Sequence, residues 1–384
     1  MPVSDSYAGL RVVEFTTTIA GPFCAMILAD LGADVIKVEV PGRGDDARAM
    51  PPHRDADSAV FHAVNRNKRS VELDLKHPAG REAFLRLTDR ADVVVQSYRP
   101  GVADRLGVGY DVVHERNPRA IYCSVSAFGS GPSATGLPGY DPLIQAFTGL
   151  MSMTGEPGRP PVRVAASLID LSTGMWAAMA VMAALARRER SGAGEHVEAT
   201  LVDTGYQLLC HQILGMAATG VVPGPLGSAS PITAPYEIFR ASDGWLMIAA
   251  GNDSLFDRLC KVVGVPELPL DPRFASSAAR VRERETLHAL IESRIARGTT
   301  TDWLEALRAA GVPAGPVHDL AQAVAHPLAA ERHILAPCGD GEFPQVRLPI
   351  DDARPPRYRR PPRLGEHSAE VLREIGFDDE TSSR

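Results

Sequence analysis

The sequence predicts an α/β fold in which a large Rossmann-like domain with a parallel sheet is joined to a smaller α+β domain. Three observations support this prediction. Apolar segments rich in Val and Ile alternate with helical segments through the first third of the chain, as in βαβ units. A Gly-, Pro- and Ser-rich segment, residues 220–235, then interrupts this alternation. After it, a hairpin pattern precedes further helical segments, which indicates a second domain of mixed structure.

The first βαβ unit begins at residues 10–15, which predict a strand. Pro22 is expected at the first helical position, and the helix is expected to reach Leu31, with Gly32 as its stop. Residues 33–39 predict the next strand. Because strands that alternate with helices are usually parallel, we expect a doubly wound sheet with helices on both faces.

The other elements follow from the same periodicity. In the large domain, strands are predicted at residues 69–75, 91–95, 121–125 and 196–199, and helices at 78–90, 175–185, 201–216 and 368–375, with a solvated turn at 187–194. In the small domain, a hairpin is predicted at residues 236–249, and helices at 254–263, 280–297 and 301–310. We therefore expect a large domain at 1–205 that is completed by 327–384, a linker at 206–235 and a small domain at 236–326.

The composition is that of an ordinary globular chain. Of its 384 residues, 45% are hydrophobic and 23% are charged, which permits a substantial core. The formal net charge is −7 with both signs interspersed, so nucleic acid is not an expected partner. The start of the chain has no signal-peptide pattern, and the longest apolar run, residues 175–186, is too short to span a bilayer. We expect a cytoplasmic protein that does not bind membranes.

Motifs for several common chemistries are absent from the sequence. The first predicted βα turn, residues 16–22, has one glycine in place of G-x-G-x-x-G, which disfavours nicotinamide and flavin cofactors. There is no P-loop, no H-E-x-x-H and no G-x-S-x-G. The five cysteines are far apart and form no C-x-x-C, so neither a disulfide framework nor a metal site is expected.

One acidic residue, Asp170, stands at the predicted start of the long apolar helix. The unpaired N–H groups and partial positive charge of a helix N-terminus favour an ionised carboxylate and could also stabilise an oxyanion. A nucleophilic carboxylate needs such an environment. Local sequence alone favours the simpler alternative, in which Asp170 only caps the helix.

Two groups of basic residues are candidates for binding phosphate. Arg99 and Arg105 follow the predicted strand 91–95, and open α/β sheets bind ligands at the carboxyl ends of their strands. The basic run at residues 65–69 is either a solvated loop, the more common case, or a phosphate site.

Several segments, taken in order, resemble CoA-transferase family III, the formyl-CoA-transferase-like or CaiB/BaiF family. The resemblance extends through nearly the whole chain. The segments that carry it are Gly21-Pro22, 28–39, Gly44-Asp45, 65–76, Arg99-Pro100-Gly101, 106–110, Asn117-Pro118, Gly139-Tyr140-Asp141, 165–174, 271–274, 310–317 and 364–367. Each is weakly specific by itself, whereas their order is highly specific.

The resemblance implies an acyl-CoA:carboxylate CoA-transferase in which Asp170 is the nucleophile. In such a reaction the aspartate attacks an acyl-CoA thioester and forms a mixed anhydride as CoA leaves. CoA then forms an aspartyl thioester and is passed to an acceptor carboxylate. Splitting one exchange into nearly balanced steps makes each step easier, provided that water is excluded.

The same resemblance implies which residues contact CoA, here a substrate rather than a resident cofactor. They are Thr18, Ile19, Leu73, Asp74, Leu75, Lys76, Ser97, Tyr98, Arg99, Arg105, Leu137, Pro138, Gly139 and Tyr140. Some members stack an arginine on the adenine at the position of Val40, so that interaction is not expected here.

Two other functions are alternatives to a CoA-transferase: a racemase of the same fold and a protein that binds acyl-CoA without catalysis. Racemases of the same fold use a histidine where this chain has Tyr140, which favours a transferase, because tyrosine is a poor acid–base group near neutral pH. A non-catalytic acyl-CoA-binding protein is the third hypothesis.

The short segments 226–231 and 249–253 resemble those of members that use succinyl-CoA and small dicarboxylates. The family also implies a homodimer of interlocked rings, for which residues 220–235 and 327–362 are candidate connections.

Overall fold

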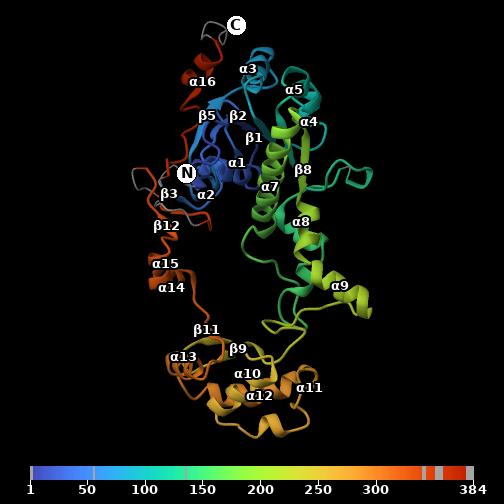
Figure 1. Ribbon diagram of the computed structural model, residues 1–384, viewed down its shortest axis with the longest axis vertical. Coiled ribbons are helices and arrows are strands. Elements are labelled where there is room, and N and C mark those ends of the chain that lie inside the picture. Colours follow the sequence, from blue (N-terminus) through green and yellow to red (C-terminus); the bar gives the residue numbers. More distant parts are fainter. Residues whose placement is uncertain (1–2, 55–56, 135, 340–342, 351–357, 378–384) are drawn as a thin grey trace. The chain divides into compact units, whose positions relative to one another are not determined.

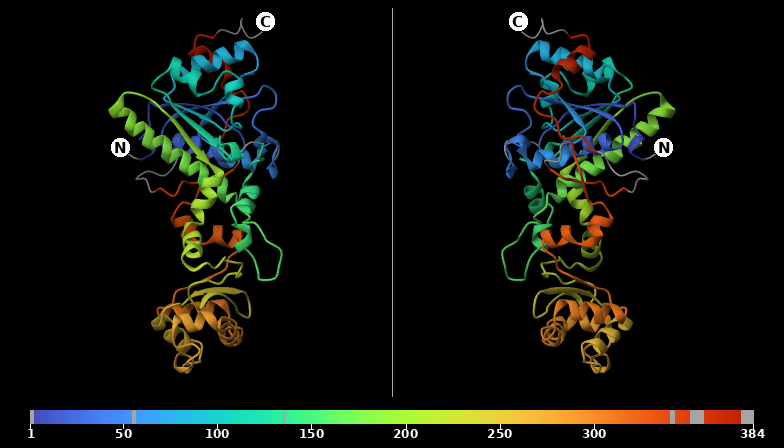
Figure 2. Two further views of the ribbon diagram at one scale, coloured as in Figure 1. Left: turned by 90° about the vertical axis from the view of Figure 1, so that its right-hand side faces the viewer. Right: turned by 90° about the vertical axis from the view of Figure 1, so that its left-hand side faces the viewer.

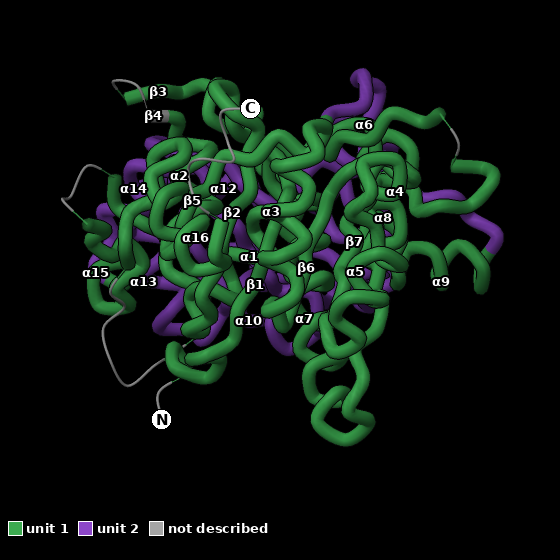
Figure 3. Tube along the Cα trace, turned by 90° about the horizontal axis from the view of Figure 1, so that it is seen from above, with its two compact units in different colours: residues 1–150, 163–219, 328–384 green, residues 151–162, 220–327 purple. Residues whose placement is uncertain are grey.

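The computed structural model describes residues 3–54, 57–134, 136–339, 343–350 and 358–377 (Figure 1). The chain separates into two compact units (Figure 3). The first contains residues 1–150, 163–219 and 328–384, and the second contains 151–162 and 220–327. Residues 151–162 thus lie outside the first unit, and the segment expected as a linker is divided between the units at residues 219 and 220. Parts of the candidate connection 327–362 (340–342 and 351–357) lie outside the described residues.

The first unit is built on a six-stranded parallel sheet, which confirms the predicted fold class. Its order is β5-β2-β1-β6-β7-β8. The strands are β1 (Arg11–Phe15), β2 (Asp34–Glu39), β5 (Lys68–Glu72), β6 (Val93–Gln96), β7 (Ile121–Ser126) and β8 (His196–Thr200). Since every strand runs in the same direction, the loops that follow the strands all lie along one edge of the sheet.

Helices cover both faces of this sheet (Figure 2). Helices α1 (Ala20–Asp30) and α7 (Leu168–Ser191) pack on one face. Helices α3 (Pro78–Thr88), α5 (Tyr110–Arg116) and α16 (Ser368–Glu374) pack on the other. The last of these comes from the C-terminal part of the chain, so the large unit is discontinuous in sequence.

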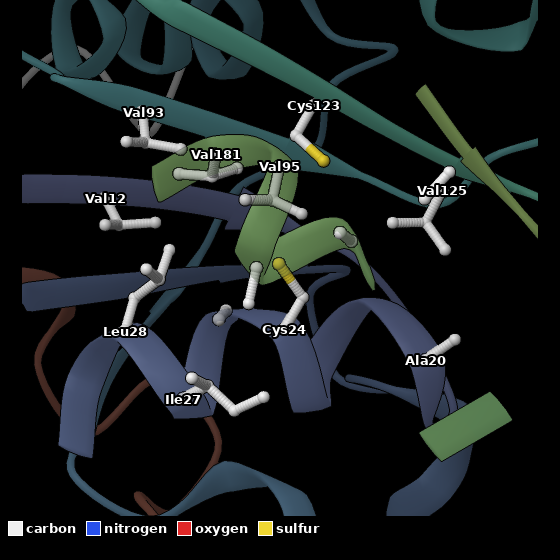
Figure 4. Close-up of a cluster of buried hydrophobic side chains, with 14 of the residues drawn as sticks. Val12, Ala20, Cys24, Ile27, Leu28, Val93, Val95, Cys123, Val125 and Val181 are labelled. Carbon is white, nitrogen blue, oxygen red and sulfur yellow. The ribbon is translucent and has the colours of Figure 1, made fainter. Parts of the chain in front are cut away.

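Apolar side chains from alternate strand positions close the face under α1 and α7 (Figure 4). The cluster includes Val12, Val93, Val95 and Val125 from the sheet, Cys24 and Leu28 from α1, and Val181 from α7. Complete burial of a side chain of the size of Val or Leu contributes about 1.5–3 kcal/mol. This packing fixes the direction of α7 and therefore the position of its first turn.

The second unit has an antiparallel sheet of order β11-β10-β9, with a helical layer. The strands are β9 (Tyr236–Arg240), β10 (Trp245–Ala249) and β11 (Ala314–Pro316), and the helices are α10 (Asp253–Val262), α11 (Ser277–Arg282), α12 (Arg284–Ile295), α13 (Thr300–Ala309) and α14 (Leu320–Ala325). The core of this unit surrounds Phe239, Phe256 and Phe274. Strand β11 was not predicted, because three residues of sequence Ala-Gly-Pro carry no strand signal.

Short elements complete the described chain. They are helices α2 (Ala59–Asn65), α4 (Val102–Arg105), α6 (Asp141–Phe147), α8 (Leu201–Leu208), α9 (Cys210–Thr219) and α15 (Pro327–Glu331), and strands β3 (His53–Arg54), β4 (Asp57–Ser58), β12 (Leu335–Ala336) and β13 (Gln345–Val346). Single turns of 3₁₀ helix lie at Val3–Asp5, Asp46–Ala49, Pro132–Ala134, Met151–Met153 and Leu268–Leu270.

Several helix boundaries differ from those predicted. Helix α1 begins at Ala20, so Pro22 lies within the first turn, where its missing N–H removes no helical hydrogen bond. The predicted helix 201–216 is two helices, and the predicted helix 280–297 is broken at Glu283. Residues 187–191, predicted as a turn, continue α7 because Arg and Glu favour helices. The helix ends at Gly192, which has a φ of +75°.

Among the described residues, one helix, α7, is long and apolar enough to cross a membrane by length and composition. The sequence prediction considered only the uninterrupted apolar run and so did not count the helical residues around it. Side chains of α7 such as Ile169, Ala177 and Val181 are completely buried in the first unit. Core helices of globular proteins have these same properties.

Candidate active site

Asp170 lies in the first turn of α7, after Leu168 and Ile169, with Ser167 at the N-cap. Its side chain is mostly buried. Within the described part of the chain, no group donates a hydrogen bond to its carboxylate. The carboxylate oxygens therefore have lone pairs free to attack a ligand.

A second carboxylate, Asp141 at the start of α6, caps α7 from outside the helix. One of its oxygens accepts hydrogen bonds from the backbone N–H groups of Ile169 (2.7 Å) and Asp170 (3.2 Å). The other accepts a hydrogen bond from the Gln145 side chain at 2.5 Å, and Gln145 is itself bound to the backbone of Val164. Asp141 is buried, so this arrangement is closed to water.

This cap changes the electrostatics expected of Asp170. The N–H of Leu168 bonds to the Ala166 carbonyl, and those of Ile169 and Asp170 bond to Asp141, so the helix start has no free donor for an oxyanion. Burial, followed by the nearby Asp141 charge, raises the pKa of Asp170 to about 7. The helix terminus therefore does not stabilise an ionised Asp170 in the way expected, because its donors bind Asp141. The result is a more basic carboxylate, which is a stronger nucleophile when ionised.

A glycine in the second turn of α7 brings this helix against the start of α1. A Cβ on Gly174 would lie 2.7 Å from the Ala20 carbonyl oxygen, so a larger residue does not fit there. Asp170 is four residues earlier and lies on the same face of α7. Gly174, one helical turn after Asp170, thus packs against the start of α1, which directly follows the predicted CoA-binding residues Thr18 and Ile19.

The turn after β6 is joined to the turn after β1. The Ser97 hydroxyl accepts a hydrogen bond from the Thr17 backbone N–H at 3.0 Å. Tyr98 packs against Phe15 with ring centroids 5.6 Å apart, and burial raises the pKa of the Tyr98 hydroxyl. Two of the predicted contact regions are thus side by side.

Arg99 and Arg105 are both exposed beyond this turn. Neither is hydrogen-bonded or ion-paired through its side chain to any residue that the structure describes. Exposed guanidinium groups of this kind are free to bind an anion.

The predicted residues after β5 have mixed environments. Leu73 and Leu75 are buried in the core, so their side chains are not free to contact a ligand. Asp74 and Lys76 are exposed. This segment follows the edge strand β5, which β2 separates from the turn after β1. The Asp74 carboxylate accepts a hydrogen bond from the Lys76 backbone N–H at 2.9 Å, so the structure leaves the Lys76 side chain available at this point.

The segment Leu137–Tyr140 leads directly into Asp141. Leu137, Pro138 and Tyr140 are exposed, whereas Gly139 packs closely. A Cβ on Gly139 would lie 1.9 Å from the Cβ of Ala127. The position of this segment is thus coupled to that of Asp141 and, through the cap, to Asp170.

The basic run 65–69 is neither a solvated loop nor a free phosphate site. Arg66, Lys68 and Arg69 are buried, and they pair with Asp30 (2.6 Å), Glu14 (2.6 Å) and Asp34 (2.6 Å), respectively. Sequence reasoning missed these pairs because their carboxylates come from distant segments.

The described ranges contain no group of three or more His, Cys, Asp or Glu residues that could hold a metal ion. All five cysteines are free, and four of them are buried.

Comparison with known proteins identifies the family. Residues 7–368 match the sequence model of CoA-transferase family III. The chain belongs to CoA-transferase family III. An Acetobacter aceti protein named acetyl-CoA:oxalate CoA-transferase is 39% identical over 96% of this chain and 95% of its own length. An Agrobacterium fabrum protein named succinate–glutarate CoA-transferase is 38% identical over 98% of this chain and 97% of its own length.

Solved structures agree with this assignment. The crystal structure of a CaiB/BaiF family protein from Brucella suis has a TM-score of 0.86 and 39% identity, and the match covers 96% of this chain and 98% of that one. This family III member is an acyl-CoA:carboxylate CoA-transferase, as the resemblance implied.

Proposed function

We propose that this CoA-transferase moves CoA from an acyl-CoA donor to a small dicarboxylic acid through covalent intermediates on Asp170. The observation that supports the proposal is the Asp170 carboxylate itself. It is mostly buried and has a pKa raised to about 7, no described group donates to it, and it lies one helical turn before Gly174, which packs against the start of α1.

The first step requires an ionised Asp170. A carboxylate oxygen attacks the thioester carbon, the C–S bond breaks, and CoA leaves as a thiolate, so that a mixed anhydride remains. The thiolate then attacks the aspartyl carbonyl carbon and releases the donor acid as its carboxylate. An acceptor carboxylate attacks the carbonyl carbon of the aspartyl-CoA thioester, the C–S bond breaks, and CoA leaves as a thiolate, so that a second mixed anhydride remains. The thiolate then attacks the acceptor carbonyl carbon of this anhydride, which forms the acceptor acyl-CoA and releases Asp170 as a carboxylate.

The groups around Asp170 suit this sequence of steps. Burial makes the carboxylate basic and limits the access of water, which would hydrolyse an anhydride. The unpaired guanidinium groups of Arg99 and Arg105 suit the phosphates of CoA. Position 140 holds a tyrosine where racemases of the same fold use a histidine, so racemisation is the less favoured alternative.

The substrate class rests on relatives and on the loops of the second unit. Two relatives are named for oxalate and for succinate and glutarate, all of which are small dicarboxylates. The short segments 226–231 and 249–253 resemble those of members that use succinyl-CoA. We therefore propose succinyl-CoA as a donor and a small dicarboxylate as the acceptor.

Trapping the intermediate tests the proposal. The protein is incubated with succinyl-CoA, the reaction is quenched, and peptides are analysed by mass spectrometry. An adduct on the Asp170 peptide, together with loss of exchange in Asp170→Ala, is expected. Asp203→Ala is the matched control, because Asp203 also lies in the first turn of a helix, α8, but is exposed. An adduct at another residue, or deuterium exchange at the α-carbon without an acceptor, would contradict the proposal.

We also propose that the chain forms a homodimer. Met175, Trp176 and Met179 expose 45%, 44% and 46% of their surface on one side of α7. A patch of large apolar side chains on a helix is typical of a face that a partner covers. Light scattering on the purified protein should give twice the mass of the chain, and the mass of a single chain would refute this point.

A further inference from the structure

The layer beneath α1 contains charged residues where a parallel sheet is usually apolar. The side chains of Glu14, Lys37, Asp45 and Lys68 are all fully buried. Burying ionised groups costs free energy unless each is paired and hydrogen-bonded. A cluster of buried charges of this kind can instead serve to fix one particular conformation of the chain.

Lys37 connects this group to the turn after β1. Its ammonium lies 2.9 Å from an Asp45 oxygen and 3.6 Å from Glu14, and donates a hydrogen bond to the Thr16 carbonyl at 3.0 Å. Burial alone would lower the pKa of Lys37, but the charges of Asp45 and Glu14 raise it above its ordinary value. The ammonium therefore stays charged, and Lys68 neutralises Glu14 from the other side at 2.6 Å.

Asp45 binds the same turn with its second oxygen. That oxygen accepts hydrogen bonds from the backbone N–H groups of Thr18 and Ala47, each at 2.9 Å. The Ser97 hydroxyl binds the N–H of Thr17. Three consecutive residues of the turn are thus held through their backbones by side chains from three other parts of the first unit.

The held residue, Thr18, has an unusual conformation. Its φ is +72°, in the left-handed region that a β-branched residue avoids. A residue keeps such a conformation only when its surroundings impose it. The Asp45 hydrogen bond to the Thr18 N–H acts directly on this residue, and Lys37 keeps the Asp45 carboxylate in place.

We propose that Asp45 and Lys37 are positioning residues that hold Thr18 in the left-handed conformation and so preform the CoA-binding turn. The proposal rests on the proposed function, because that function makes the turn a CoA site. A turn that is already ordered does not lose conformational freedom when CoA binds, so binding is tighter. Neither residue is assigned any contact with the reacting atoms.

A double-mutant comparison tests this role. Glycine adopts a positive φ without strain, so Thr18→Gly removes the need for an external restraint, whereas Thr18→Ala removes the side chain but keeps the strain. In the wild-type and Thr18→Ala backgrounds, Asp45→Asn should raise KM for acyl-CoA and Kd for CoA about tenfold, with little change in kcat. In the Thr18→Gly background, Asp45→Asn should change KM for acyl-CoA and Kd for CoA less than threefold.

Two controls separate positioning from general destabilisation. Asp30→Asn breaks another buried ion pair of the first unit, at the far end of α1, and should lower stability without changing KM in either background. If Asp45→Asn does not fold, the double substitution Lys37→Met/Asp45→Asn removes both charges and leaves Glu14 paired with Lys68. An equal effect of the Asp45 substitution in the wild-type and Thr18→Gly backgrounds would overturn the proposal.

The readouts also distinguish this proposal from the proposed function. Calorimetric binding of CoA requires no chemistry at Asp170. If CoA binding shows the expected dependence on the Thr18→Gly background but the wild-type protein exchanges no CoA, the proposed function alone is refuted. If the wild-type protein exchanges CoA but binding shows no such dependence, the positioning role alone is refuted.

Discussion

Asp141 accepts hydrogen bonds from the backbone N–H groups of Ile169 and Asp170, and thus occupies the helix terminus in front of the Asp170 side chain. Two carboxylates share one helix start, but only one of them uses its hydrogen-bond donors. These donors bind Asp141, whereas Asp170 is left with burial and a neighbouring negative charge. The different environments give the two residues different roles, Asp141 as the cap and Asp170 as the proposed nucleophile.

The rate of acyl transfer should rise with pH through about 7. A protonated carboxyl group is a poor nucleophile, and the pKa of Asp170 is raised to about 7, so the reactive fraction grows over this interval. Single-turnover release of CoA from an acyl-CoA, measured between about pH 5.5 and 8.5, reports this titration. A rate that is constant over the interval would contradict the role of Asp170.

Asp141→Asn should move that pH dependence to lower pH. The substitution removes the negative charge that helps to raise the pKa of Asp170, while the asparagine oxygen can still cap α7. Its amide faces the Gln145 amide, and this conflict should lower the free energy of unfolding by about 1–2 kcal/mol. The pH–rate profile and urea denaturation measure the two effects, with Asp203→Asn as the control. An unchanged profile would exclude an influence of Asp141 on Asp170.

Asp170→Asn should stabilise the protein at alkaline pH. The folded-state pKa is about 7 and the unfolded value is about 3.9, so the folded state binds more protons between these values. Stability therefore falls as pH rises from about 4 to 7, with a cost on the order of 2–4 kcal/mol above pH 7. Asp170→Asn should recover most of this lost stability at about pH 8 and little at about pH 4, as measured by urea denaturation. A variant that is less stable than wild type at the higher pH would contradict the prediction.

Gly139→Ala should reduce both stability and activity. The added Cβ would overlap Ala127, so the segment before α6 must shift by an ångström or more, at a cost of about 1–3 kcal/mol. Such a shift would carry Asp141 away from the start of α7 and lower kcat. Gly131→Ala is a suitable control, because nothing lies within 4 Å of its new Cβ. Equal behaviour of the two variants would show that Gly139 has no special role.

The parallel sheet and the position of Asp170 could be predicted because both follow from local patterns. Continuous apolar strands such as Val93–Gln96 signal burial on both faces, and Asp170 lies shortly before the apolar run 175–186. The role of Asp141 could not be predicted in this way. It is 29 residues from Asp170 and next to Pro142, so its local signal is only that of a helix start.

The buried charges were missed for a related reason. In the sequence, Lys68 and Arg69 belong to a basic run that resembles a surface loop. Their partners, Glu14 and Asp34, come from other strands and become neighbours only when the sheet assembles. The positive φ of Thr18 was equally invisible, because no residue preference would place threonine there.

The return of the chain to the first unit has a consequence for biosynthesis. Arg69 of β5 pairs with Glu370 and Glu374 of α16, each at 2.7 Å, and Val371 and Ile375 complete the core on that face. While the chain is still on the ribosome, this apolar surface has no cover until α16 has been translated and has left the exit tunnel. We expect the large unit to reach its final state only after α16 has emerged, with a chaperone-accessible intermediate before that point in elongation.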